Sequence, residues 1–148
     1  MNIIEINEIR TPCLIDQLVQ VWEASVRETH LFLSDKEIRI IRNYVPQALR
    51  EVSRLIVLED EEKHPVGFMG LEDQKLEMLF LSPEKRRRGF GKKLLVYGME
   101  NYSVNELAVN EQNPLAIGFY EHLGFQVYKR SRHDEQGNPY PILYMKRY

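Results

Sequence analysis

The sequence LEMLFLSPEKRRRGFGKKLL, residues 76–95, decides how the rest of the chain is interpreted. Its opening part, Leu76–Leu81, is a mainly apolar run of a length typical of a buried strand. Pro83 ends the run, because proline cannot donate a hydrogen bond to a sheet. Gly89 and Gly91 then introduce a helical pattern. Its apolar face is formed by Leu94, Leu95, Gly98, Met99 and Tyr102.

The order strand, glycine-bearing loop, helix predicts a site for an anion. Free backbone N–H groups and the positive end of the helix dipole both point into such a loop. Six of the nine residues from Lys85 to Lys93 are Lys or Arg, which adds positive charge at the same place. The alternative interpretation is a solvated basic turn that merely precedes a helix.

Two common phosphate-binding motifs do not fit this loop. The nucleotide P-loop requires Ser or Thr after its lysine, whereas Lys92 is followed by Lys93. The dinucleotide motif GxGxxG requires glycine where Leu94 stands. The pattern present is Arg86-x-x-Gly89-x-Gly91. In these residues the sequence resembles the GNAT acetyltransferase superfamily, whose loop of this form binds the pyrophosphate of acetyl-CoA.

A second motif lies 22 residues beyond Gly91, in residues 113–125. Asn113 is a helix N-cap, Pro114 suits the first helical position, and Gly124 ends the helix. Its expected buried face consists of Ala116, Phe119, Tyr120 and Leu123. The series Asn-x-x-Ala-x-x-Phe-Tyr-x-x-x-Gly-Phe resembles the second GNAT signature. The two motifs together cover about a third of the chain.

Length and composition predict one ordinary soluble globular domain, residues 1–148. Hydrophobic residues make up 43% of the chain, charged residues 28%, and the net charge is −2. The basic loop is therefore local, which favours a small anionic ligand over a nucleic acid. The single cysteine, Cys13, fits a reducing cytoplasm, and no stretch has the length of a membrane span.

The remaining periodicities predict a mixed α/β (α+β) fold. Expected strands are Asn2–Asn7, Leu55–Leu58, Pro65–Leu71, Leu76–Leu81, Glu106–Asn110, Phe125–Ser131 and Tyr140–Tyr148. Further helices are expected at Pro12–Val26, capped by Thr11, and from Asp35 to Pro46, opened by a capping box. The resulting sheet of six to seven strands is mostly antiparallel, with helices on both faces. The connection through a helix predicts a parallel or splayed pair between Leu76–Leu81 and Glu106–Asn110.

The resemblance implies roles for individual residues. Tyr120 matches the family's general acid, which protonates the leaving thiolate, and Glu77 is the candidate base, acting through water. Residues expected to bind acetyl-CoA are Leu79, Phe80, Leu81, Arg86, Arg87, Arg88, Gly89, Phe90, Gly91, Lys92, Asn113 and Tyr120. Structural roles are the alternatives: a packed tyrosine, a surface carboxylate and a purely capping asparagine.

In the GNAT superfamily the region between the first two helices commonly borders the acceptor site. The resemblance therefore implies an acceptor pocket formed by His30 and Phe32 of this region together with the nearby Trp22. The alternative places the two aromatic residues in the core and the histidine in an ordinary loop. No metal site is expected. Cys13 has no adjacent histidine and is a poor candidate for a covalent nucleophile.

The sequence therefore predicts an N-acetyltransferase that moves acetyl from acetyl-CoA to a primary amine by direct attack in a ternary complex. A sensor that binds acyl-CoA without turnover, or a nucleic-acid-binding module, are the alternatives. A monomer or homodimer in the cytoplasm is expected, without membrane or nucleic-acid partners. The acceptor stays open among antibiotics, polyamines, amino acids, peptide N-termini and protein lysines.

Overall fold

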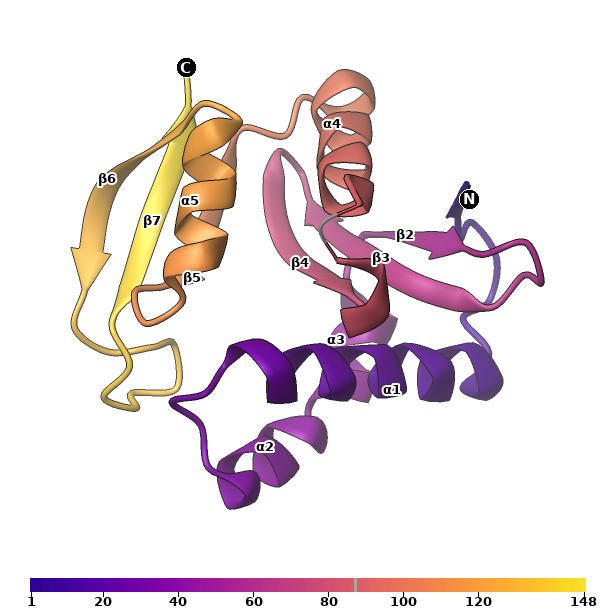
Figure 1. Cartoon of the computed structure of the whole chain (residues 1–148), viewed down its shortest axis with the longest axis horizontal. Helices are drawn as coiled ribbons and strands as arrows, with labels where there is room; N and C mark the ends of the chain where they lie inside the picture. The colour runs from indigo at the N-terminus through magenta and orange to yellow at the C-terminus, as the bar shows by residue number, and fades with distance from the viewer. Residues whose placement is uncertain (87) are drawn as a thin grey trace.

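The computed structural model describes residues 1–86 and 88–148, which form one seven-stranded sheet with helices on both faces (Figure 1). The strand order is β1-β2-β3-β4-β5-β7-β6. The strands are β1 (Asn2–Glu5), β2 (Arg54–Glu59), β3 (Pro65–Glu72), β4 (Lys75–Leu81), β5 (Glu106–Asn110), β6 (Phe125–Ser131) and β7 (Ile142–Arg147). The helices are α1 (Pro12–Thr29), α2 (Asp35–Arg42), α3 (Val45–Glu51), η1 (Pro83–Lys85, a 3₁₀ turn), α4 (Phe90–Tyr102) and α5 (Pro114–His122).

The sheet opens between its two central strands. β4 and β5 are parallel and pair only at Lys75–Glu106 and Leu76–Leu107; every other neighbouring pair is antiparallel. Beyond these two pairs the strands diverge into a V (Figure 1). The predicted mostly antiparallel sheet with a splayed central pair is confirmed.

An irregularity in β4 coincides with the opening. Leu71 of β3 pairs with Leu76 of β4, but the next residue back, Gly70, pairs with Met78. Glu77 is thus an extra residue, a β-bulge of the kind that bends a strand and re-aims its side chains. Past the bulge β4 pairs with β3 alone among the described residues, so its other edge faces the gap with backbone groups that no described strand pairs.

Alternation along β2 divides the core between the two faces of the sheet. Leu55 and Val57 pack with α1, α2 and α3, whereas Ile56 and Leu58 pack on the side of α4. The apolar cluster on the α4 side also includes Leu107 of β5, Phe125 of β6 and Met145 of β7. Apolar contacts therefore connect the two arms of the V. Helices on both faces, as predicted, leave the V itself as the open part of the molecule.

The caps are confirmed, and two helix boundaries are corrected. The Thr11 side chain accepts from Leu14 N–H at 3.1 Å, and Ser34 with Glu37 forms the complete capping box. α1 continues to Thr29, three residues past the predicted end. α2 ends at Arg42, and Pro46 lies in the first turn of a separate helix, α3, because proline's missing N–H needs no partner there.

The two terminal strands are shorter than expected. β1 ends at Glu5 rather than Asn7, and β7 begins at Ile142 rather than Tyr140. Tyr140 therefore belongs to the connection between β6 and β7, which reaches toward α2.

Candidate active site

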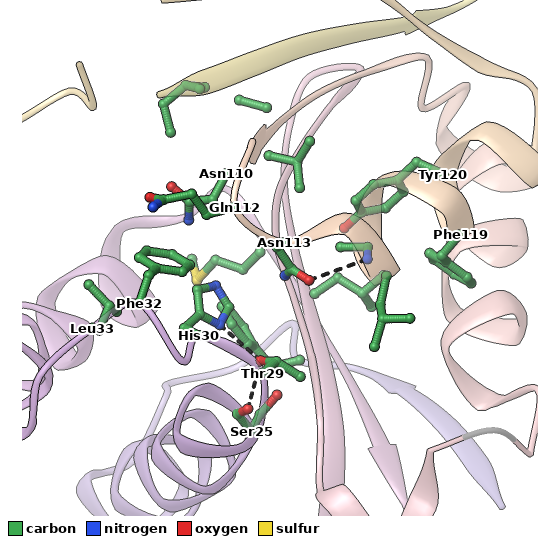
Figure 2. A pocket seen from close by; sticks show the side chains of 18 of the residues that line it. Ser25, Thr29, His30, Phe32, Leu33, Asn110, Gln112, Asn113, Phe119 and Tyr120 are labelled. Carbon is green, nitrogen blue, oxygen red and sulfur yellow. Dashed lines mark hydrogen bonds between the residues drawn. The ribbon is translucent and has the colours of Figure 1, made fainter. Parts of the chain in front are cut away.

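A cleft of about 1690 Å³ occupies the opening of the V. Its walls come from β4, β5 and α5, and its floor and rim come from the α1–α2 connection, α2 and the β6–β7 connection. Figure 2 shows His30 and Tyr120 on opposite sides of this space, with Asn113 between them in the view. Twelve of the sixteen residues predicted for donor binding, catalysis and acceptor binding line this cleft.

The glycine loop forms the end of the cleft at α4. Gly89 is the N-cap of α4 and has φ +79°, a left-handed conformation that favours glycine. Gly91 has a different reason to be glycine: an added Cβ would lie 3.3 Å from Leu81 Cδ1 and 3.6 Å from Phe119 Cζ. Gly89, Gly91 and Lys92 line the cleft beside a helix N-terminus, which fits the predicted anion site.

Two cations of this loop, Arg86 and Lys93, hydrogen-bond to other parts of the chain. Arg86 turns to α1, where Nη2 donates to Ser25 Oγ at 2.7 Å and to Ser25 O at 3.2 Å. Lys93 Nζ donates to Met1 O at 3.0 Å. Arg88 and Phe90 are absent from the cleft lining, and Phe90 packs against the core; Arg87 lies outside the described residues. Among the loop's described side chains, only Arg86 and Lys92 line the cleft, and Arg86 is held by α1.

Tyr120 joins the core to the cleft. Its ring is 9% exposed and packs edge-to-face on Phe119 and Phe125, with centroid distances of 5.3 and 6.1 Å. The hydroxyl has no hydrogen-bond partner among the described residues, and Figure 2 shows it directed into the cleft. Burial raises the pKa of Tyr120 above its ordinary value, so the phenol stays protonated.

Asn113 caps α5 and still faces the cleft. Its Oδ1 accepts from Ala116 N–H at 3.3 Å, which is the expected capping bond. The amide NH₂ group is directed toward the cleft (Figure 2). Capping and ligand contact, which the sequence left as alternatives, are thus compatible.

Glu77 lies at the bulge of β4 and lines the cleft, with its side chain 35% exposed. Its Oε1 is 3.5 Å from Lys75 Nζ, on the same strand. The carboxylate therefore lies on the strand expected to carry the base, but the ammonium group of Lys75 is already close to it.

His30 follows the last turn of α1 and points into the cleft (Figure 2). Its Nδ1 lies 2.9 Å from Thr29 Oγ1, and that hydroxyl donates to Ser25 O at 2.8 Å. Burial, and secondly the positive charge of Arg86, lower the pKa of His30 below its usual value. The imidazole is consequently neutral at pH 7.

The acceptor side is completed by aromatic residues from two separate connections. The Phe32 ring lies 5.5 Å from His30 and 5.3 Å from Tyr140, centroid to centroid. The Tyr140 hydroxyl donates to Glu37 of α2, which joins α2 to the β6–β7 connection. Trp22, predicted in the same pocket, is instead 6% exposed in the core, because its position on α1 faces the sheet.

Sequence reasoning missed Ser25, Thr29, Glu37 and Tyr140 at this site. Glu37 had a sufficient explanation in the capping box, and Tyr140 followed a turn-rich segment whose place in space no local pattern indicates. Ser25 and Thr29 carried one usable signal. They are four apart on a helix and so share one face, and Thr29 directly precedes His30.

Two kinds of chemistry lack support in the described part of the chain. In residues 1–86 and 88–148 no group of three or more His, Cys, Asp or Glu could hold a metal ion. Cys13 is exposed in the first turn of α1 and does not line the cleft.

Within residues 1–86 and 88–148, no helix has the length and apolar character required to span a membrane.

An anion-binding loop, an open strand edge and a protonated tyrosine around one cleft suit a phosphate-bearing donor and an acyl transfer. A family model described as "Acetyltransferase (GNAT) domain" matches residues 32–140. The chain belongs to the GNAT acetyltransferase family. This GNAT protein is an N-acetyltransferase, and the enzymatic prediction is confirmed over the sensor. The family uses acetyl-CoA.

Similar proteins extend over nearly the whole chain. Peptidyl-lysine N-acetyltransferase YjaB of Escherichia coli (strain K12) is 39% identical over 132 residues, which is 86% of this chain and 86% of YjaB. YjaB of Salmonella typhimurium is 37% identical over 128 residues, 86% of this chain and 88% of its own length. The solution structure of apo YjaB from E. coli superposes with a TM-score of 0.87 at 36% identity, covering 99% and 97% of the two chains.

A more distant structure supports the fold. The PaiA N-acetyltransferase of Thermoplasma acidophilum, solved with coenzyme A, has a TM-score of 0.69 at 22% identity and covers 100% of both chains. The GNAT fold predicted from two short motifs is confirmed.

Proposed function

We propose that this enzyme transfers the acetyl group of acetyl-CoA to the ε-amine of lysine side chains in proteins or peptides. The observation that carries acetyl transfer is the free Tyr120 hydroxyl in the same cleft as the glycine loop. The lysine acceptor is supported by the two YjaB relatives, which are named peptidyl-lysine N-acetyltransferases.

The described residues fit the acyl donor. Backbone N–H groups at the start of α4, with Lys92 beside them, suit the pyrophosphate. The unpaired edge of β4 between Met78 and Leu81 offers N–H and C=O groups to the amides of the pantetheine arm. A backbone N–H at the bulge would polarise the thioester carbonyl.

Direct attack needs a base and an acid. The amine nitrogen bonds to the acetyl carbon, the carbon–sulfur bond breaks, and the sulfur leaves as thiolate. Tyr120 gives its phenolic proton to that sulfur, which completes free CoA, and the phenolate then regains a proton from solvent. The amine proton passes to a base in the cleft, where Glu77, expected from the sequence, and His30 are both placed.

The acceptor side suits a long cationic side chain with an apolar stem. Phe32 and Leu33 supply apolar surface, and the carboxylates of Glu28, Glu77 and Glu135 lie along the lining. Carboxylates along the cleft raise the local concentration of a cation such as a lysine ammonium.

The test is release of free thiol from acetyl-CoA with a panel of acceptors. An N-terminally blocked peptide with one lysine should turn over, and the same peptide with norleucine in its place should not. Spermidine, an aminoglycoside and free amino acids complete the panel. A kcat/KM at least tenfold higher for a small amine than for any lysine peptide would refute the lysine acceptor and leave acetyl transfer standing.

A further inference from the structure

The hydrogen bonds around His30 determine which ring nitrogen carries the proton. The Thr29 hydroxyl has one hydrogen and donates it to Ser25 O, because a carbonyl oxygen can only accept. Thr29 Oγ1 must therefore accept in its contact with His30 Nδ1. The neutral imidazole is the Nδ1–H tautomer, and its Nε2 carries a free lone pair.

The surroundings keep this imidazole uncharged without occupying Nε2. Arg86, from the loop after η1, is the cation beside it and is held by Ser25, with Glu28 of α1 at 4.0 Å from Nη1. On α2, Glu37 accepts hydrogen bonds from Ser34 and from Tyr140.

His30 meets the requirements of a general base better than Glu77 does. The Glu77 carboxylate has Lys75 at 3.5 Å, whereas Nε2 of His30 has no hydrogen-bond partner among the described residues. Imidazole is also the side chain that exchanges protons nearest to neutral pH, where general acid–base catalysis is most efficient.

We propose that His30 is the general base of the acetyl transfer and accepts the proton of the attacking amine at Nε2. The proposal rests on the function proposed above. A lysine ammonium first loses one proton to water. As the free amine attacks, its nitrogen becomes cationic and acidic, and Nε2 takes the second proton. The resulting imidazolium has N–H donors at both nitrogens and returns the proton to solvent after the product leaves.

Thr29 is a positioning residue in this scheme. Its hydroxyl holds the ring and fixes the tautomer, through a bond to Nδ1 that leaves Nε2 toward the cleft. Thr29→Val removes that acceptor at nearly constant volume, whereas Thr29→Ser retains it.

The experiment compares His30→Gln with wild type on the best lysine peptide. We expect kcat to fall on the order of 10²-fold, the usual contribution of a general base, with acetyl-CoA affinity unchanged. Imidazole added to His30→Ala should restore part of the rate. His64→Gln is the matched control, because His64 is exposed in the β2–β3 turn and should behave as wild type. Thr29→Val should lose rate, and Thr29→Ser should recover it.

The pH profile separates a base from a merely structural histidine. Ionisation of the acceptor ammonium gives log(kcat/KM) a slope of one across neutral pH in every variant. In wild type the slope should steepen toward two at acidic pH, below the lowered pKa of His30, where the imidazole becomes protonated. This steepening should disappear in His30→Gln.

Three results would overturn the proposal: a kcat of folded His30→Gln within threefold of wild type, failure of imidazole to restore His30→Ala, or a steepening that persists in His30→Gln. Loss of the steepening in Glu77→Gln instead would assign the base to Glu77. If wild type releases no thiol with any amine, the proposed function has failed, which is a different result.

Discussion

Replacement of Tyr120 by Phe tests the proposed general acid with little structural disturbance. The ring contributes apolar contacts to Phe119 and Phe125, and phenylalanine retains these. The hydroxyl has no partner among the described residues, so its removal leaves no buried polar group unpaired. We therefore expect the free energy of unfolding to change by less than about 0.5 kcal/mol.

The kinetic effect should be much larger than the effect on stability. Loss of one general acid costs on the order of 10²-fold, which is about 2.7 kcal/mol of transition-state stabilisation at 1.36 kcal/mol per tenfold. The effect should fall on kcat, because the glycine loop that would hold the donor is a separate part of the cleft.

The direction of the Tyr120 pKa adds a pH test. A phenol whose pKa is raised above its ordinary value of 10.0 stays protonated below that pH, so Tyr120 should cause no loss of wild-type activity up to about pH 10. Steady-state thiol release and acetyl-CoA titration on both proteins supply the measurement. Full turnover by a folded Tyr120→Phe protein would mean that water or another group protonates the thiolate.

Three further variants test the loop, the core and a remote cluster. Gly89→Val should weaken coenzyme A binding in calorimetry and cost about 1–2 kcal/mol of stability, because a β-branched residue is strained at φ +79°; unchanged affinity would remove the loop from the donor site. Gly67→Val should destabilise by about 1–3 kcal/mol in urea titration, since even a Cβ would lie 2.5 Å from Leu81 Cδ2; wild-type stability would contradict this packing. Glu5 accepts from the hydroxyls of Tyr97 and Tyr102, which lower its pKa below 4.5. Its stabilising contribution is thus present above pH 4.5 and lost as pH falls through the lowered pKa. Glu5→Gln should reduce Tm at pH 7, and this reduction should shrink progressively as the pH is lowered below 4.5. A reduction that does not change with pH would refute the charge-based explanation.

Local patterns were sufficient for most of the fold. Proline, capping residues and glycine are short-range signals, so α5 was predicted from Asn113 to Gly124, and Glu106–Asn110 and Phe125–Ser131 were predicted with the bounds found. α3 was missed because a proline such as Pro46 is found both just after the end of a helix and in the first turn of the next helix. Nothing local distinguishes them.

The site depends on contacts that no short segment encodes. The Glu77 bulge arises from pairing with β3, and the turn of Arg86 toward Ser25 joins residues 61 positions apart. Trp22 illustrates the opposite error: proximity in sequence to His30 suggested a shared pocket, but successive helical residues point in different directions. The tautomer of His30 required the positions of two side chains, Thr29 and His30, and of the Ser25 carbonyl.

The short ladder between β4 and β5 has a consequence for the lifetime of the protein. β4 and β5 pair at only two positions, Lys75–Glu106 and Leu76–Leu107. In the described part of the chain, no strand lies beside the rest of that edge of β4. A donor that hydrogen-bonds to this edge would complete the sheet and stabilise only the folded chain. A donor at a free concentration of 100 times its Kd adds about 2.7 kcal/mol to the free energy of unfolding. The unfolded fraction open to proteases would then fall about 100-fold, so acetyl-CoA abundance would set how long the enzyme persists as well as how fast it works.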